Sequence, residues 1–90
     1  MTPEQQLTAA VVRRLKELRA DGRRIWWAKL AGGPMQQRGL PDLLIVYNGR
    51  AVFAELKAGR NGPTRLQSIR IDDLRAAGAA AAVCLSLIHI

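Results

Sequence analysis

Asn48-Gly49 is flanked on both sides by apolar and β-branched residues within the stretch 39–57. Asn-Gly between two such runs is the strongest short-range signal for a two-residue β-hairpin bend, because both positions of that bend require a positive φ angle. A two-residue loop pairs Tyr47 with Arg50, so the numbers of paired residues sum to 97. The sequence therefore predicts two antiparallel strands in a defined register.

This register places Asp42 opposite Glu55, with Lys57 two residues further along the same face. Side chains paired across antiparallel strands lie with their Cβ atoms roughly 4.5–5.5 Å apart, and two facing carboxylates repel unless a positive charge lies between them. A hard cation such as Mg²⁺ is bound through one or two carboxylates, and a neighbouring lysine can act on a water or stabilise an oxyanion. The three residues indicate a metal-dependent phosphodiesterase. The alternative, a surface carboxylate pair, is disfavoured by the apolar residues around them.

These residues resemble those of a known nuclease superfamily. Pro41-Asp42 followed by Glu55-Leu56-Lys57 matches the PD-(D/E)XK pattern. Glu4 in a leading helix, Gln67 near the start of a later helix and the form Gly39-Leu40-Pro41-Asp42 are similar to the virus-type replication-repair nuclease domain, VRR-NUC. The resemblance covers nearly the whole chain. It implies an α/β fold with a restriction-endonuclease-like core, in the order α-β-β-β-α-β, and a mixed sheet flanked by helices.

The resemblance also assigns roles within the predicted site. It implies that Asp42, Glu55 and the backbone carbonyl of Leu56 bind Mg²⁺ or Mn²⁺. It also implies that Lys57 assists the attacking water and that Gln67 helps to position this water. For Glu4 the sequence alone leaves two readings open, a site carboxylate or a side chain that complements the helix dipole, and the resemblance favours the site. The implied activity is a structure-selective DNA endonuclease acting on Holliday junctions or other branched DNA in replication, recombination or repair. Small phage-type members of this family look like dimers.

The charge of the chain agrees with a nucleic-acid partner. Fourteen Lys and Arg against seven Asp and Glu give a net charge of +7, and such an excess attracts polyanions. The basic residues expected to contact DNA are Lys29, Arg38, Arg60, Arg65 and Arg70. A basic protein that binds DNA without cleaving it, or a fragment of a larger repair protein, is the alternative. Ninety residues form a single small domain near the limit of independent stability, so a homodimer is expected.

The N-terminus has no apolar signal segment, and no apolar run is long enough to cross a membrane. Cys84 is the single cysteine, which excludes a disulfide framework and a zinc cluster. We therefore expect a protein of a reducing cytoplasm, bacterial or encoded by a phage and acting in the host cell.

Helix signals bracket the predicted hairpin. Thr2 and Gln5 form a capping-box pattern before a helix that ends at Asp21-Gly22, and Thr64 is placed to cap a second helix reaching about residue 77. The apolar residues expected to face inward are Leu7, Val11, Leu15 and Leu18 in the first helix, and Leu66, Ile69 and Leu74 in the second. Residues 25–30 predict a first strand in which Trp26 and Trp27 face opposite sides, so that one of them is in the core.

We expect one nuclease-like domain over residues 1–84 and a last strand from residue 79 to 87. Residues 85–90 are either the end of that strand or a tail encoded by a sequencing adapter, because one reading frame of a transposon mosaic end encodes the same six residues. His89 is therefore given no chemical role.

Overall fold

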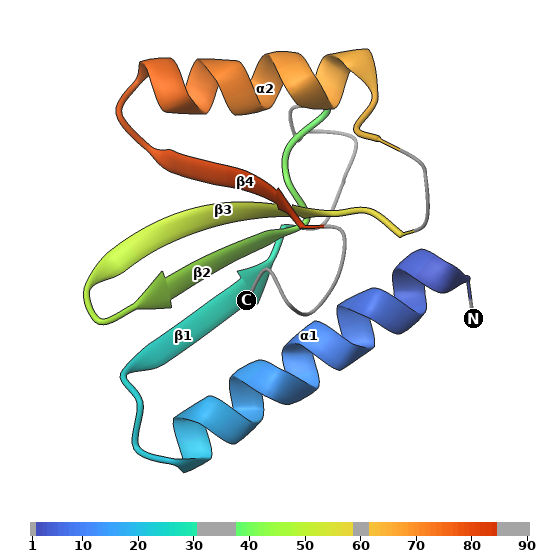
Figure 1. Cartoon of the computed structure of the whole chain (residues 1–90). Helices are drawn as coiled ribbons and strands as arrows, with labels where there is room; N and C mark the ends of the chain where they lie inside the picture. The colour runs from blue at the N-terminus through green and yellow to red at the C-terminus, as the bar shows by residue number, and fades with distance from the viewer. Residues whose placement is uncertain (1, 31–37, 59–61, 85–90) are drawn as a thin grey trace.

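The computed structural model describes residues 2–30, 38–58 and 62–84. Within these residues two helices and four strands follow in the predicted order (Figure 1). Their bounds are α1 Pro3–Ala20, β1 Ile25–Lys29, β2 Leu43–Tyr47, β3 Arg50–Leu56, α2 Arg65–Ala76 and β4 Ala80–Cys84. The end predicted for the last strand and the tail at 85–90 lie outside the described residues. Neither described helix is both long and apolar enough to span a membrane.

The hairpin has the predicted register. Asn48 and Gly49 have φ angles of 50° and 81°, and the ladder runs from Tyr47 opposite Arg50 to Leu43 opposite Ala54. Beyond this hairpin the sheet has the order β1-β2-β3-β4, with β1, β2 and β3 antiparallel and β4 parallel to β3. The parallel pair requires a crossover connection, and α2 forms part of it. The mixed sheet flanked by helices is confirmed.

Helix α1 begins where its capping residues predict. The Thr2 side chain accepts a hydrogen bond from the Gln5 backbone N–H at 3.1 Å, and the Thr2 N–H donates to Gln5 Oε1 at 2.9 Å. These two bonds satisfy backbone donors that an uncapped helix end leaves free. Further along the helix, Val11 and Leu15 are buried against the sheet.

The core lies between α1 and one face of the sheet. Its buried members are Val11, Leu15, Leu43, Ala54, Leu56 and Cys84. Trp27 packs against this cluster, and the Arg19 guanidinium lies 4.4 Å from its ring centroid. Trp26 points to the opposite face and is 53% exposed. One tryptophan is therefore in the core, as expected.

Helix α2 lies on the opposite side of the sheet from α1, as Figure 1 shows, but it does not bury the expected residues. Leu66 and Ile69 are 38% and 43% exposed, whereas Ile71 is only 4% exposed. The expectation for Leu66 and Ile69 was wrong because α2 packs chiefly on β4, which turns Ile71 inward. Leu66 instead lies close to Gly39, in the segment that leads to β2, so that a Cβ added at Gly39 would come within 2.7 Å of the Leu66 Cγ atom. The second face of the sheet is thus only partly covered.

Candidate functional site

Asp42 and Glu55 meet where β2 begins and β3 ends. Asp42 immediately precedes Leu43, and Glu55 follows Ala54, the partner of Leu43 in the ladder. The Asp42 Oδ2 atom accepts a hydrogen bond from the Leu56 backbone N–H at 2.7 Å. This bond holds the Asp42 carboxylate against the end of β3, beside Glu55.

Glu55 is the buried charged residue of the described chain, with 1% of its surface exposed. Its Oε1 atom accepts a hydrogen bond from Gln67 Nε2 at 3.2 Å. When Glu55 is ionised, its buried Oε2 atom has no hydrogen-bond donor among the described residues. A buried acceptor without a partner loses its hydration without compensation, at a cost of about 1–3 kcal/mol and more when it is charged. This carboxylate is therefore suited to a cationic ligand.

The electrostatic surroundings raise the pKa of Glu55 from 4.5 to about 8. The largest cause is burial, which disfavours the charged form. A side-chain hydrogen bond with Asp42, which needs a proton on one of the two carboxyl groups, and the negative charge of Asp42 raise it further. The positive charge of Lys57 lowers this pKa, and the negative charge of Glu4 raises it. The charges of Asp42, Lys57 and Glu4 thus all act on the Glu55 carboxyl group.

Lys57 forms an ion pair with Glu4. Its Nζ atom lies 3.7 Å from Glu4 Oε1, and the two side chains are 11% and 46% exposed. The pair joins the first turn of α1 to the end of β3. Sequence reasoning missed this contact because it joins residues far apart in the chain, and no local pattern indicates it.

Gln67 makes two separate contacts with the two ends of its side-chain amide. Its Oε1 atom accepts a hydrogen bond from the Thr64 backbone N–H at 2.8 Å, and its Nε2 atom donates to Glu55. The Gln67 backbone N–H in turn donates to Thr64 Oγ1 at 3.2 Å. The capping box of α2 therefore orients the Gln67 side-chain amide, which donates a hydrogen bond to Glu55. The spacing Thr64-x-x-Gln67 repeats that of Thr2-x-x-Gln5, so the sequence carried a signal for this box.

A pocket of about 600 Å³ opens between α1 and the carboxylate end of the sheet. Glu4, Lys29, Asp42 and Leu56 are among its lining residues. Lys29, the last residue of β1, is exposed. Three of the predicted site residues and one of the predicted DNA-contacting residues therefore share this opening.

The other predicted DNA contacts are placed differently. Arg38 and Arg65 are exposed. Arg70 donates from Nε to the Arg38 carbonyl at 3.0 Å and lies 3.3 Å from an Asp73 carboxylate oxygen, so part of its guanidinium is used within the protein. Arg60 lies outside the described residues.

The donor atoms fit a hard divalent cation. Within residues 2–30, 38–58 and 62–84, no three His, Cys, Asp or Glu side chains converge closely enough to hold a metal ion. An ion here would depend on Asp42 and Glu55, with its other positions left to backbone, water or phosphate oxygens, as Mg²⁺ commonly accepts. The unpartnered Glu55 Oε2 is the observation that supports this fit.

No family model and no curated protein matches the chain. A solved structure described as a VRR_NUC domain superposes with a TM-score of 0.80 at 24% sequence identity, covering 99% of this chain and 90% of its own. The chain has the fold of a VRR-NUC domain. The two carboxylates, Lys57 and Gln67 meet at one end of the sheet within this VRR-NUC fold.

Proposed function

We propose that the chain is an endonuclease that hydrolyses DNA phosphodiester bonds with Mg²⁺ or Mn²⁺. The observation that carries this proposal is the placement of Asp42 beside Glu55, whose buried Oε2 has no partner among the described residues. The positive charge of Lys57 lowers the pKa of the same Glu55 carboxyl group. The likeness to a structure described as a VRR_NUC domain supports a nuclease of the PD-(D/E)XK type.

In this proposal Asp42, Glu55 and the Leu56 carbonyl hold the cation, and Glu4 contributes to the same site directly or through a water. A bound divalent cation polarises phosphate oxygens and lowers the pKa of a coordinated water. The ammonium group of Lys57 assists the attacking water or stabilises negative charge that develops on the phosphate. Gln67 keeps Glu55 in place through its Nε2 hydrogen bond.

The proposed substrate is branched DNA, such as a Holliday junction, cut during replication, recombination or repair. The net charge of +7 supports a polyanionic substrate. A homodimer suits a junction, because two sites related by twofold symmetry would meet two symmetric strands. A reducing cytoplasm is the proposed location, which agrees with the free thiol of Cys84.

The test is a cleavage panel. Labelled four-way junction, flap and linear duplex DNA are incubated with the protein in Mg²⁺, in Mn²⁺ and in EDTA. We expect cleavage that requires the metal, is strongest on branched DNA, is lost in Asp42→Asn and is strongly slowed in Lys57→Met, while both variants retain DNA binding. Binding without cleavage in either metal would instead favour a non-catalytic nucleic-acid-binding module, which the charge of the chain also supports.

A further inference from the structure

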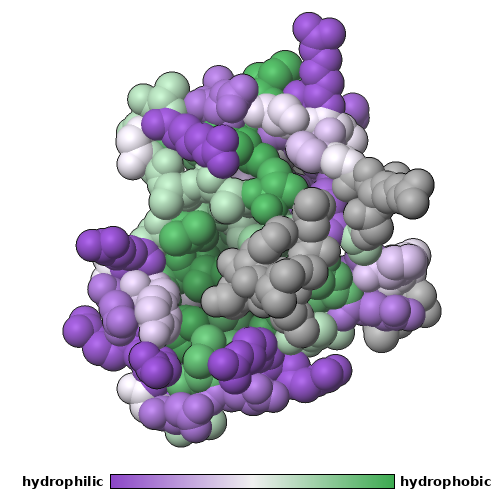
Figure 2. Space-filling view, in the orientation of Figure 1, coloured by the Kyte–Doolittle hydropathy of each residue, from purple (hydrophilic) through white to green (hydrophobic). Residues whose placement is uncertain are grey.

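The end of the sheet opposite the two carboxylates carries arginines in the last turn of α1, on the α1–β1 connection and at the start of β3. The Asn48 backbone N–H donates to the Arg24 carbonyl at 2.9 Å, which joins the hairpin bend to the α1–β1 connection. We define the distal arginine cluster as Arg19, Arg23, Arg24 and Arg50, all exposed. Figure 2 shows hydrophilic side chains gathered at this edge of the molecule. Asp21 is the acidic residue nearest to the cluster in sequence.

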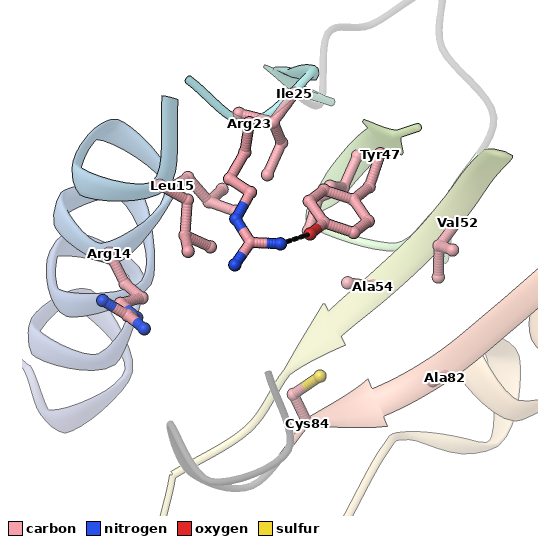
Figure 3. A pocket seen from close by; sticks show the side chains of 11 residues that line it. Arg14, Leu15, Arg23, Ile25, Tyr47, Val52, Ala54, Ala82 and Cys84 are labelled. Carbon is pink, nitrogen blue, oxygen red and sulfur yellow. Dashed lines mark hydrogen bonds between the residues drawn. The ribbon is translucent and has the colours of Figure 1, made fainter. Parts of the chain in front are cut away.

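Two of these arginines are held by aromatic residues and not by carboxylates. Arg23 donates from Nη1 to the Tyr47 hydroxyl at 3.2 Å (Figure 3), and the Arg19 guanidinium lies over the Trp27 ring. Within the described residues the ion pairs involve Arg14, Lys57 and Arg70, and none involves the distal arginine cluster. A guanidinium has five N–H donors. Most of the donors of these arginines are therefore open to an anionic ligand.

Trp26 lies beside Arg24, on the face of the sheet opposite α1. Arg19 and Arg23 lie on the α1 face, where they contact Trp27 and Tyr47, so the cluster and Trp26 together reach around this end of the sheet. The Trp26 side chain is 53% exposed, and it lines a shallow pocket of about 270 Å³ together with Arg24, Val46 and Gly49. An exposed indole beside a guanidinium can stack on a base or a sugar while the arginine contacts the adjacent phosphate. The pairing of an aromatic face with unpaired positive charge matches nucleic acid better than an apolar protein partner, because charged residues are depleted in the cores of protein interfaces.

We propose that the distal arginine cluster and Trp26 form a second nucleic-acid contact, separate from the carboxylate end of the sheet. This second proposal rests on the proposed function, because DNA is named as the bound polyanion only if it is the substrate. The five residues of β2 separate the two ends, a span of roughly 17 Å at about 3.4 Å per residue. Consecutive phosphates of one strand are about 3.4 Å apart along the helix axis. One DNA molecule could therefore contact both ends of the sheet at phosphates about five nucleotides apart, or a branched DNA could contact each end with a different arm.

The test compares two double variants that remove equal charge. Arg24→Gln/Arg50→Gln alters the distal arginine cluster, and Arg13→Gln/Lys16→Gln alters the exposed side of α1. Affinity for a fluorescent four-way junction is measured in EDTA over a series of salt concentrations. The slope of log K against log salt is negative, and each lost phosphate contact reduces its magnitude by about 0.9. We expect the magnitude to fall by about 1.8 in the distal double variant and to stay at the wild-type value in the control. Equal decreases in both would overturn the proposal.

Fluorescence provides a second measurement. Junction DNA should change the tryptophan emission of the wild type, and this change should be absent in Trp26→Phe, which retains Trp27. A change that persists in Trp26→Phe would contradict a contact at Trp26. Sedimentation velocity tests for a second copy on this surface: a distal double variant that dissociates a dimer and keeps the wild-type salt slope would overturn the proposal.

The binding tests need no cleavage, so the two proposals fail separately. The nuclease proposal would be refuted, and the second contact supported, if the protein never cleaves DNA but the salt slope of its DNA affinity is reduced only in the distal double variant. A protein that cleaves DNA with equal slopes in all three forms would refute only the second contact.

Discussion

Gln67 Nε2 donates a hydrogen bond to Glu55 Oε1 at 3.2 Å, from the first turn of α2 to the buried end of β3. The same amide accepts from the Thr64 N–H through its oxygen. A reversed amide would break both bonds, so the capping box fixes which atom faces Glu55. Helix α2 therefore orients the carboxylate as well as covering part of the sheet.

Matched truncations should separate these two roles of Gln67. Gln5→Ala and Gln67→Ala each remove the glutamine of a Thr-x-x-Gln capping box, but only Gln67 also bonds Glu55. We expect Gln5→Ala to cost about 0.5–1 kcal/mol of unfolding free energy, as other cap losses do. Gln67→Ala should cost roughly 1–3 kcal/mol more, because it leaves a buried acceptor unpaired. Urea unfolding at pH 7 measures both, and equal costs would show that the Glu55 bond adds nothing.

The raised pKa of Glu55 predicts that stability falls as the pH rises. The folded protein binds this proton more tightly than the unfolded chain does, since the pKa goes from 4.5 to about 8 on folding. Its contribution is therefore complete below pH 4.5 and is lost as the pH rises through about 8. Urea unfolding in EDTA between pH 5 and 9 should show this decline, and Glu55→Gln should flatten it. Parallel pH profiles for the two proteins would contradict the account.

A divalent cation should reverse this dependence. The cation competes with the proton for Glu55, so Mn²⁺ should stabilise the wild type more at pH 8 than at pH 5. The thermal midpoint of unfolding, recorded with and without Mn²⁺ at both pH values, measures this difference. The difference should vanish in Glu55→Gln. An identical shift at both pH values would indicate that Mn²⁺ binds elsewhere.

The Glu4–Lys57 ion pair predicts coupled effects on activity. Because Glu4 is half exposed, Glu4→Gln should change stability by no more than about 1 kcal/mol. If Glu4 acts by positioning Lys57, the double variant with Lys57→Met should have a single-turnover rate no slower than that of Lys57→Met alone. Single-turnover cleavage of labelled DNA measures all three variants. Losses that multiply would show that Glu4 acts independently of Lys57, as a metal ligand would.

Gly39 and Gly49 offer a matched pair for testing how the segment before β2 packs. Both have positive φ angles, 80° and 81°. A Cβ at Gly39 would lie 2.7 Å from Leu66 Cγ and 3.1 Å from its backbone carbonyl atoms, whereas one at Gly49 would meet nothing within 4 Å. Gly49→Ala should cost about 1–2 kcal/mol for the backbone alone. Gly39→Ala should cost about 1–3 kcal/mol more. Chemical unfolding gives both values, and equal costs would contradict the Leu66 contact.

The elements that follow local rules were predictable from the sequence. The Asn48-Gly49 bend set the register because two-residue turns allow few geometries, and Thr2 and Thr64 marked where the helices begin. Contacts between distant segments were not predictable in this way. The pairing of Glu4 with Lys57 depends on how α1 lies on the sheet, and no short spacing encodes it.

The prediction of which α2 residues face inward was wrong for a related reason. Leu66 and Ile69 have helical spacing, but α2 packs mainly on the edge strand β4, so only part of its apolar surface meets the sheet. Periodicity shows that a helix has an apolar side and does not show how much of that side finds a partner. The contact of Leu66 with Gly39 likewise depends on the path of the chain before β2.

Calorimetric titration with Mn²⁺ tests the central claim most directly, namely that the hairpin register makes Asp42 and Glu55 a joint cation site. The wild type should bind Mn²⁺ at this site, and Asp42→Asn and Glu55→Gln should each weaken binding at least tenfold. Asp72→Asn, on the exposed surface of α2, should bind as the wild type does. Unchanged Mn²⁺ affinity in Asp42→Asn and Glu55→Gln would contradict the account.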